Sequence, residues 1–316
     1  MSCKTIAIFT VENDLHALAV KHALADRKDV ACHVVETDRV CNSSGFKWST
    51  EAESFPCTVP TRDGAVLPIA DADLIWWRRF NVQKIPPHVT QPEHVDLINN
   101  DCAAALGGAA VNEFQGVWVN DPRATRAAEN KLIQLKAAQK AGFKVPQTLI
   151  SNDIEHVRKF CGMLHGNVVV KSVRGTAMAP LLTQPLDEQH LDADSLRLSP
   201  AIFQERIPGN YHLRVHCFGE EVHAVRIESQ ALDWRQNLDV PFQAYEVPDD
   251  LRAKLLRAVR ELGLRMGIVD LKLCDDGTPA WLEINPQGQF LFVEGIADLK
   301  LTDAFATFLC EQVGRS

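Results

Sequence analysis

A hairpin near the end of the chain carries the pattern that most constrains its fold. Residues 267–286 read GIVDLKLCDDGTPAWLEINP, which is two strand-like runs on either side of the dipeptide Asp276-Gly277. Asp-Gly is a strong signal for a two-residue hairpin loop, because a type I′ turn needs positive φ at both of its central residues. We therefore expect an antiparallel pair of strands in which Asp275 lies opposite Thr278.

This pairing brings two carboxylates together. Counting back from the loop places Asp270 opposite Glu283, with Asn285 two residues along on the same face. Facing carboxylates repel, and Mg²⁺, which binds few protein oxygens and completes its shell with waters and phosphates, would remove the repulsion. A solvated sheet face with incidental acids would give the same isolated pattern. Large apolar neighbours favour a built site. Trp281 flanks the acids, and Leu282 and Ile284 are expected on the strand's other face.

The size and composition of the chain suit a globular protein of several units. Its 316 residues are enough for about two or three α/β units. No apolar run reaches the roughly 20 residues that span a bilayer, and the first residues lack the long apolar stretch of a signal peptide. The nine cysteines are scattered without a CxxC pair, which argues against a zinc knuckle or a disulfide framework. We expect a cytoplasmic protein.

The charge of the chain bears on its partners. The formal net charge is −8, which gives no support for broad binding to nucleic acid or to an anionic membrane. A local basic cleft stays compatible with this balance. We therefore expect neither class of partner.

Hydrophobic periodicity divides the chain into three segments, 1–118, 119–200 and 201–316. The first segment has a β-α-β opening, which predicts a parallel sheet. The second begins with a helix that starts at Asp121-Pro122 and ends at Gly142, followed by the strand NVVVK that ends at Lys171. The third contains two hairpins and predicts an antiparallel sheet. The fold class is therefore α/β (α+β).

Two lysines are candidates for phosphate binding. The chain lacks both G-x-x-x-x-G-K-[ST] and G-x-G-x-x-G, so a bound nucleotide would need other groups. Lys171 leaves an apolar strand and enters a loop with Gly175 and Thr176, which suits phosphate neutralisation, although lysines also end strands for solubility. Lys131 lies in the middle of the predicted helix, in AENKLIQL, and its position alone predicts a solvated side chain.

Two arginines occur on the hairpin predicted around Gly219. A three-residue loop would place Arg226 opposite Arg214. Facing arginines repel, and an anion between them would stabilise both. The alternative is that each arginine has a local acidic partner: Glu205, Glu220 or Glu228.

In their order along the chain, these elements resemble the ATP-grasp superfamily. In that family the nucleotide lies between two α+β lobes, two lysines contact its phosphates, a hinge strand holds the adenine, and Asp, Glu and Asn bind Mg²⁺. The residues that match are Lys131, Lys171, the hinge residues Gln204, Glu205 and Ile207, and Asp270, Glu283 and Asn285.

A finer resemblance is to the microviridin-type peptide ligases, or graspetide synthetases, which have a pre-ATP-grasp N-terminal domain. Their motifs are matched by five stretches that lie along most of the chain: 76–79 (WWRR), 120–135, 145–152, 233–235 (DWR) and 283–290. The resemblance implies ATP and Mg²⁺ as cofactors and a precursor peptide, leader plus core, as the partner. In such ligases an Asp or Glu side chain of the peptide is phosphorylated, and a hydroxyl or amine of the same peptide attacks to close an ester or amide ring.

The resemblance also implies roles for individual side chains. Lys131 and Lys171 would hold the α- and β-phosphates, and Mg²⁺ on its three ligands would bridge the β- and γ-phosphates. Arg214 and Arg226 would stabilise charge on the acyl-phosphate, and Arg235 would bind the substrate carboxylate.

One position departs from the resembled pattern. These ligases usually carry an acid two residues before the first arginine of the hairpin, where it can bind the ATP ribose, and this chain has His212 there. His donates or accepts a hydrogen bond, so we expect nucleotide binding to survive with altered affinity or base preference. The ribose ligand stays an open question.

Three alternatives remain open. The first is an ATP-grasp ligase that joins a small-molecule carboxylate to an amine, because its ATP site would be the same. The second is an ATP-grasp kinase, and the third is a nucleotide-binding scaffold without turnover, which the facing Asp270 and Glu283 argue against. Dimers are common in the resembled family, so a homodimer is also an expectation.

Overall fold

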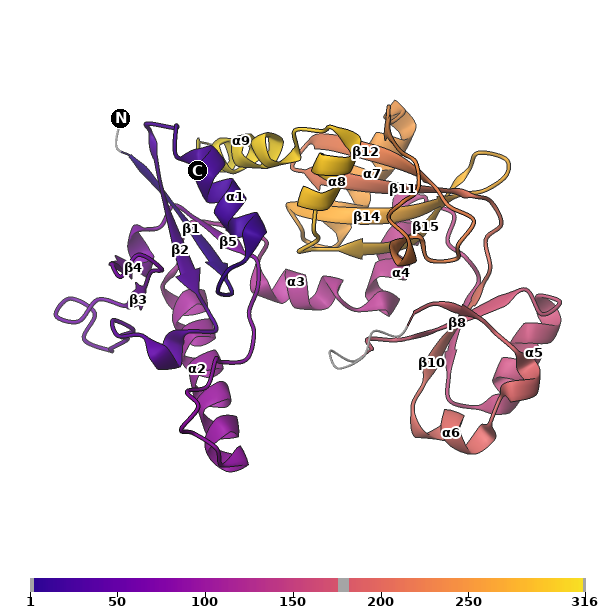
Figure 1. Cartoon of the computed structure of the whole chain (residues 1–316), viewed down its shortest axis with the longest axis horizontal. Helices are drawn as coiled ribbons and strands as arrows, with labels where there is room; N and C mark the ends of the chain where they lie inside the picture. The colour runs from indigo at the N-terminus through magenta and orange to yellow at the C-terminus, as the bar shows by residue number, and fades with distance from the viewer. Residues whose placement is uncertain (1–2, 176–181, 315–316) are drawn as a thin grey trace. The chain divides into compact units, whose positions relative to one another are not determined.

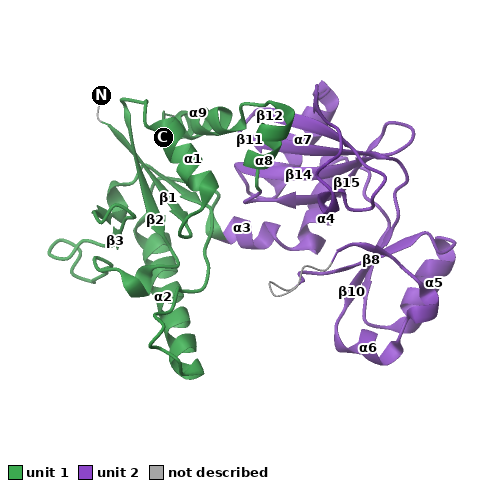
Figure 2. Ribbon diagram, in the orientation of Figure 1, with its two compact units in different colours: residues 1–122, 289–316 green, residues 123–288 purple. Residues whose placement is uncertain are grey.

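The computed structural model describes residues 3–175 and 182–314, and the chain forms two compact units (Figure 1, Figure 2). Unit 1 comprises residues 1–122 and 289–316, and unit 2 comprises residues 123–288. This division joins the second predicted segment to most of the third and groups the last helices with the first. The three-segment division therefore stays a prediction.

Unit 1 is built on a four-stranded parallel sheet with the strand order β2-β1-β5-β6, which confirms the predicted parallel sheet. Its strands, with the small β3-β4 ribbon, are β1 (Lys4–Thr10), β2 (Val30–Glu36), β3 (Thr58–Pro60), β4 (Val66–Pro68), β5 (Leu74–Trp77) and β6 (Val117–Val119). Its helices are α1 (Leu15–Leu24), α2 (Pro92–Glu113), α8 (Leu291–Ala297) and α9 (Leu301–Gly314).

Aromatic packing explains why the C-terminal helices belong to unit 1. Phe305 on α9 packs on Trp76 of β5, with 4.7 Å between the ring centroids, and both side chains are buried. At the start of α8, the His16 side chain accepts hydrogen bonds from the backbone N–H groups of Phe290 and Leu291, at 3.0 and 3.2 Å. Burial and the nearby Arg78 lower the pKa of His16 to about 4, so the ring is neutral and free to accept these bonds at neutral pH.

Unit 2 contains two antiparallel sheets, with the strand orders β7-β10-β8-β9 and β13-β12-β11-β14-β15. Its strands are β7 (Thr148–Ser151), β8 (Val168–Ser172), β9 (Gln184–Pro185), β10 (Ala201–Glu205), β11 (Tyr211–Phe218), β12 (Glu221–Glu228), β13 (Phe242–Tyr245), β14 (Met266–Leu273) and β15 (Pro279–Asn285). Its helices are α4 (Lys131–Ala141), α5 (Ile154–Met163), α6 (Ala193–Leu198) and α7 (Asp249–Glu261), and α3 (Pro122–Ala128) begins at the last residue of unit 1.

The five-stranded sheet has an apolar face and a polar face. Helices α4 and α7 cover the apolar face, where Leu213, Trp281 and Ile284 belong to one buried core with Leu255 and Ala138. Because successive residues of a strand point to opposite faces, the residues between these positions lie on the other face. That second face carries the charged side chains described below.

The single helix predicted from Asp121 to Gly142 is wrong. The chain forms α3 and α4, which are separated at Asn130, and the Asn130 side chain caps α4 by accepting from the backbone N–H of Leu132 at 2.9 Å. Asn favours such N-cap positions because its side chain satisfies a free N–H of the first turn. Lys131 is therefore the first residue of α4 rather than a residue in mid-helix, and Gly142 ends α4 with φ of 89°.

The buried side chain of Gln134 connects helix α4 to strand β15 through hydrogen bonds. The Gln134 side chain donates to the carbonyl oxygens of Ala128 and Ile284, at 2.6 and 2.9 Å, and accepts from the Ile284 N–H at 3.1 Å. Ile284 is the residue that follows Glu283, so this side chain fixes the part of β15 that carries the candidate metal ligand.

We expect Gln134→Ala to destabilise the protein by about 2–4 kcal/mol, because it leaves the buried N–H and C=O of Ile284 without these partners. The measurement is urea unfolding followed by tryptophan fluorescence. Gln139→Ala is the matched control, since Gln139 is an exposed glutamine on the same helix. Equal unfolding midpoints for the two variants would contradict the role given to Gln134.

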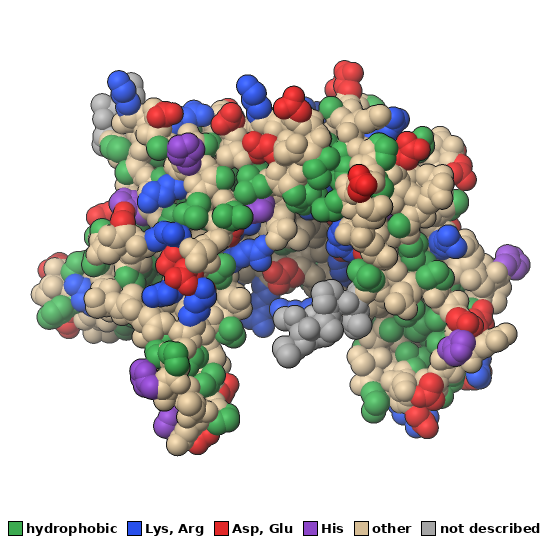
Figure 3. Space-filling model, in the orientation of Figure 1, with side chains coloured by type: hydrophobic (Ala, Val, Ile, Leu, Met, Phe, Trp, Pro, Cys, Tyr) green, Lys and Arg blue, Asp and Glu red, His purple; other side chains and the backbone are tan. Residues whose placement is uncertain are grey.

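Charged side chains of both signs lie on the surface, and the cysteines are unpaired. Figure 3 shows basic and acidic side chains interspersed over the drawn face of the molecule. All nine cysteines are free thiols. Within residues 3–175 and 182–314, no helix is both long and apolar enough to cross a membrane.

Candidate functional site

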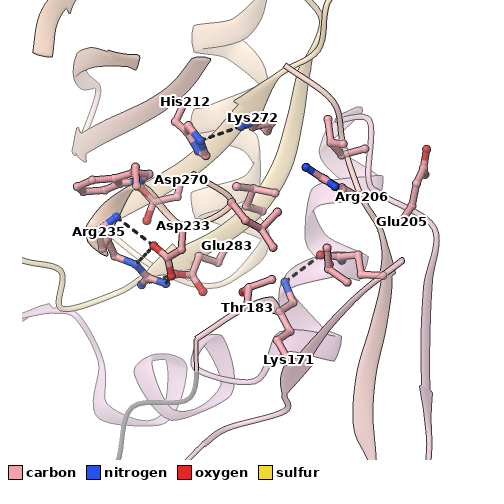
Figure 4. Close-up of a pocket in the computed structure, with 16 residues that line it drawn as sticks. Lys171, Thr183, Glu205, Arg206, His212, Asp233, Arg235, Asp270, Lys272 and Glu283 are labelled. Carbon is pink, nitrogen blue, oxygen red and sulfur yellow. Dashed lines mark hydrogen bonds and ion pairs between the residues drawn. The ribbon is translucent and has the colours of Figure 1, made fainter. Parts of the chain in front are cut away.

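A pocket in unit 2 collects most of the candidate residues. It is lined by side chains from both sheets and from the loop that contains Trp234 (Figure 4). The lining residues are Val169, Lys171, Thr183, Gln204, Glu205, Arg206, Ile207, His212, Leu232, Asp233, Trp234, Arg235, Asp270, Lys272, Leu282 and Glu283. Lys131, Arg214 and Asn285 lie outside this lining, but Lys131 and Arg214 contact the pocket carboxylates directly.

The facing carboxylates are confirmed. Asp270 on β14 and Glu283 on β15 are direct partners in the strand register, and Asn285 pairs with Ile268 one repeat further along. Asn285 therefore shares the face of Glu283, as predicted, although its side chain is exposed and accepts from the backbone N–H of Gln287 at 3.0 Å. The three predicted metal ligands thus lie on one face of the sheet.

The loop that leads to this pairing differs from the prediction. The N–H of Cys274 donates to the carbonyl of Thr278 at 2.9 Å, so three residues form the loop and Asp275 does not pair with Thr278. Gly277 has φ of 79°, the left-handed conformation that such a loop requires at its last position.

A β-bulge then restores the register. Leu271 pairs with Trp281, whereas Asp270 pairs with Glu283, so Leu282 is the extra residue of β15. The expected position of Leu282 on the apolar face is therefore wrong, since it lines the pocket beside Glu283. Trp281 lies in the apolar core and does not flank the acids on their own face. Because of the bulge, Leu282 and Glu283 both line the pocket although they are consecutive in the strand.

Each carboxylate has cationic partners. One guanidinium nitrogen of Arg214 donates to both Asp270 oxygens, at 2.9 and 3.0 Å. Glu283 accepts from Lys131 and from Arg235, the second at 3.4 Å. Arg235 is in turn held by Asp233, at 2.7 Å, and this bond raises the pKa of Arg235.

The pKa values of the two acids shift in opposite directions. Burial opposes the ionisation of both, and it raises the pKa of Asp270 even though Arg214 acts against it. For Glu283 the attraction of Lys131 outweighs burial and lowers its pKa to about 2. Glu283 is therefore ionised throughout the physiological range.

The two candidate lysines occupy different settings. Lys131 begins α4, and its ammonium group ion-pairs with Glu283. Lys171 on β8 is half-buried and donates to Oε1 of Gln204 on β10 at 2.9 Å. Burial and the nearby charge of Lys131 lower the pKa of Lys171 to about 8. The loop after Lys171 is described as far as Gly175, and Thr176 lies outside the described residues.

The predicted hinge residues lie along one wall. Gln204 bridges Lys171 and the Thr148 hydroxyl, to which it donates at 2.8 Å. Glu205 ends β10, and its carboxylate accepts from the N–H of Gln147 at 3.0 Å. Ile207 follows in the loop, where it adds an apolar surface to the pocket.

The predicted pairing of the two hairpin arginines is wrong. Phe218 pairs with Glu221, so the loop has two residues rather than three, and Arg214 lies opposite Val225. Arg226 pairs with Leu213 and therefore points to the other face of the sheet. There it donates to Gln243 at 2.6 Å and lies over the ring of Tyr211.

For the ligation that the sequence resemblance implies, we therefore expect Arg226→Ala to keep a rate within about twofold of the parent protein, as for a surface change away from the reacting groups. The measurement is the initial rate of ADP formation with the peptide that the resemblance implies as the substrate. A loss of about a hundredfold would return Arg226 to the site and contradict the observed strand register.

Two groups that the sequence reasoning did not single out also line the pocket. Lys272 on β14 contacts His212 on β11, with 2.8 Å between Nζ and Nε2. Strand alternation from Asp270 places Lys272 on the same face, but its partner depends on a pairing between strands distant in sequence. Asp233 appeared only as part of the DWR motif, which gave no signal that it holds Arg235.

The donor set fits a magnesium ion. It comprises two carboxylates on facing positions and one amide on the same face, all hard oxygen donors. Among the described residues there is no group of three or more His, Cys, Asp or Glu that could hold a metal ion by itself. Mg²⁺ often has one or two carboxylates and takes its other ligands from phosphates and water, so this set suits it when a nucleotide is present.

Comparison with known proteins gives the fold. No protein-family model matches the chain, and no curated protein matches it. The chain is similar to the crystal structure of macrocyclase MdnC bound with precursor peptide MdnA from Microcystis aeruginosa MRC. The identity is 25%, the coverage is 96% of this chain and 99% of that chain, and the TM-score is 0.85.

Two further solved structures are similar over nearly the whole chain. ATP-grasp ligase PsnB, complexed with minimal precursor, Mg and ADP, has 25% identity and a TM-score of 0.79, and the match covers 98% of this chain and 97% of that one. The Chryseobacterium gregarium RiPP-associated ATP-grasp ligase, in complex with ADP and a leader and core peptide, has 22% identity, a TM-score of 0.88 and coverage of 98% and 97%. The chain has the ATP-grasp fold, as the sequence resemblance implied.

Proposed function

We propose that this chain is an ADP-forming ATP-grasp ligase that closes rings in a precursor peptide. It activates an Asp or Glu side chain of the peptide as an acyl-phosphate and forms an intramolecular ester or amide. The observation that carries the proposal is the match over almost the whole length to a macrocyclase bound with its precursor peptide and to a ligase bound with a precursor, Mg and ADP. The pocket in unit 2, with its facing carboxylates and several cations, agrees with it.

The phosphates of ATP would lie among the cations of the pocket. Lys171 has no carboxylate in contact with it among the described residues, and a phosphate oxygen satisfies its ammonium group better than the neutral Gln204 alone. Lys131 would exchange part of its ion pair with Glu283 for a second phosphate contact. Mg²⁺, held by Asp270, Glu283 and Asn285, would supply charge neutralisation at the β- and γ-phosphates.

The reaction would take place in two steps, phosphorylation of the peptide carboxylate and then ring closure. An oxygen of the peptide carboxylate attacks the γ-phosphorus, the bond to the β-phosphate oxygen breaks, and ADP leaves. A hydroxyl or amine of the same peptide then attacks the acyl carbon, phosphate leaves, and the nucleophile loses its proton. The net change is one water lost from the peptide for each ATP converted to ADP and phosphate.

Arg235 in the pocket lining and Arg214 behind Asp270 would stabilise the negative charges of these steps. Arg235 is fixed by Asp233 and extends to Glu283, and its guanidinium would bind the substrate carboxylate beside the phosphates. Arg214, held on Asp270, would stabilise charge on the acyl-phosphate. Catalysis would rest on positioning and charge, without a covalent nucleophile from the protein.

The test is to incubate the protein with Mg²⁺, ATP and a synthetic peptide copied from a short reading frame beside the gene, and to follow both products. We expect ADP to form and the peptide to lose one or more waters by mass spectrometry. A gain of phosphate mass would identify a kinase instead. ADP formed only with a small carboxylate and an amine would identify a small-molecule ligase and overturn the peptide proposal.

A further inference from the structure

A buried lysine and a buried histidine contact each other inside the pocket. Nζ of Lys272 lies 2.8 Å from Nε2 of His212, and the two residues are only 6% and 2% exposed. Figure 4 shows the two side chains pointing toward one another, apart from the group formed by Asp233, Arg235 and Glu283. Both residues line the pocket, so the pair faces any ligand that enters it.

The contact fixes which atoms donate. A lysine ammonium group has three N–H donors and no acceptor, so Nε2 of His212 accepts and the ring proton is on Nδ1. The ammonium group keeps two further N–H donors. Within residues 3–175 and 182–314 no carboxylate contacts Lys272, and the pocket cation Arg206 adds positive charge nearby. This part of the pocket therefore offers donors and needs a ligand with acceptor oxygens.

The position of the pair indicates which part of a nucleotide it meets. His212 and Lys272 are direct partners on β11 and β14, two residues along from the pair Arg214 and Asp270 on the same face. Two residues of strand correspond to roughly 7 Å. The pair is thus one repeat away from Asp270, which is proposed to bind Mg²⁺ at the phosphates, and it lines the same pocket as the hinge residues. The sugar lies between phosphates and base in every nucleoside triphosphate.

We propose that Lys272, oriented by His212, is a specificity-determining residue that donates hydrogen bonds to the ribose oxygens of the nucleotide. The inference rests on the proposed function, because it takes ATP as the ligand. A carboxylate at this place would instead accept a hydrogen bond from a ribose hydroxyl, so the hydroxyl would have to donate. With a donor in the protein, the sugar oxygen acts as an acceptor, and an ether oxygen serves as well as a hydroxyl.

The distinction can be measured with sugar-modified nucleotides. Isothermal titration calorimetry would give the Kd of ATP, of its 2′-deoxy and 3′-deoxy analogues, and of its 2′-O-methyl and 3′-O-methyl analogues. In at least one of the two series we expect the O-methyl analogue to bind about tenfold more tightly than the deoxy analogue, because only the former keeps the acceptor oxygen.

Two variants separate the contact from other causes. Lys272→Met keeps the length of the side chain and removes the donor, and we expect it to weaken ATP about tenfold and to abolish the difference between O-methyl and deoxy analogues. His212→Asp introduces an acceptor, so the O-methyl analogue should lose affinity relative to ATP. Lys254→Met, at a lysine on α7 outside the pocket, should leave every Kd unchanged.

The outcomes distinguish this inference from the function on which it rests. If the parent protein does not bind ATP at all, the proposed function fails. If ATP binds but the deoxy analogues bind as tightly as, or more tightly than, the O-methyl analogues in both series, the ribose inference is overturned and the ligase proposal stands. Unchanged ATP affinity in a folded Lys272→Met variant would overturn it in the same way.

Discussion

Replacing Glu283 by Gln is expected to lower Mg²⁺-dependent ATP turnover by at least about a hundredfold. The substitution keeps the size of the side chain and removes the negative charge that would hold the cation against the β- and γ-phosphates, a contribution of several kcal/mol in metal-assisted phosphoryl transfer. Glu283 suits this test better than Asp270, because its pKa of about 2 keeps it ionised at the assay pH. The rate of ADP formation is measured as the Mg²⁺ concentration is varied.

Stability is the main concern in reading this variant. Glu283→Gln removes the partner of Lys131 and Arg235, whose side chains are 23% and 53% exposed, so water can solvate them and the fold should survive. Asp270→Asn is less suitable, since it would remove the carboxylate that pairs with the buried Arg214 at 2.9 Å. Glu261→Gln, at an exposed glutamate paired with Lys140, serves as the matched control. Full turnover in a folded Glu283→Gln variant would remove Glu283 from the metal site.

The acidic hairpin illustrates what local sequence can predict about this site. Alternation and the Asp-Gly dipeptide predicted Asp270 opposite Glu283 with Asn285 on the same face, and the structure has this pairing. The loop length was nevertheless wrong by one residue, and the bulge at Leu282 compensated for it. A bulge inserts one residue without changing the hydrophobic pattern on either side, so the alternation of apolar residues does not reveal it.

In the hairpin of β11 and β12, the same reasoning from loop length and strand alternation gave a wrong result. There a loop one residue too long in the prediction moved Arg226 to the wrong face, and no bulge corrected it. Because the period of a strand is two residues, a shift of one in the register exchanges the two faces completely. An arginine tolerates either environment, so the residue type could not reveal the error.

Contacts between segments that are distant in the chain could not be predicted from the sequence. Lys131 was expected in mid-helix because apolar residues recur at helical spacing on both sides of Asn130. Capping by the Asn130 side chain instead starts a new helix at that point. Its partner Glu283 is 152 residues away, and the partner of Lys272 is 60 residues away. Helix and strand periods determine which face a residue occupies, but not which strand lies beside it. The resemblance to ATP-grasp ligases, rather than periodicity, brought Lys131 into the candidate site.

Replacing Lys171 by Met is expected to weaken ATP binding about 10- to 100-fold, the usual effect of removing a charged hydrogen-bond donor from a partly buried contact. The half-buried side chain lines the pocket and has Gln204 as its partner, so Met occupies the same space without leaving a carboxylate unpaired. Calorimetric titration with ATP and Mg²⁺ measures the loss. Lys140→Met, at a lysine that is 70% exposed on α4, is the matched control and should bind ATP like the parent protein.

The pH dependence of binding tests the same residue in a second way. Burial lowers the pKa of Lys171 from 10.5 to about 8, so the ammonium form that attracts phosphate predominates below that pH and is lost above it. The affinity of the parent protein for ATP should therefore fall between about pH 7 and pH 9. Lys272, whose pKa is also about 8, contributes to that fall in both proteins. The part due to Lys171 is the difference between the parent and Lys171→Met, so parallel pH profiles with equal affinities would exclude Lys171 from phosphate binding.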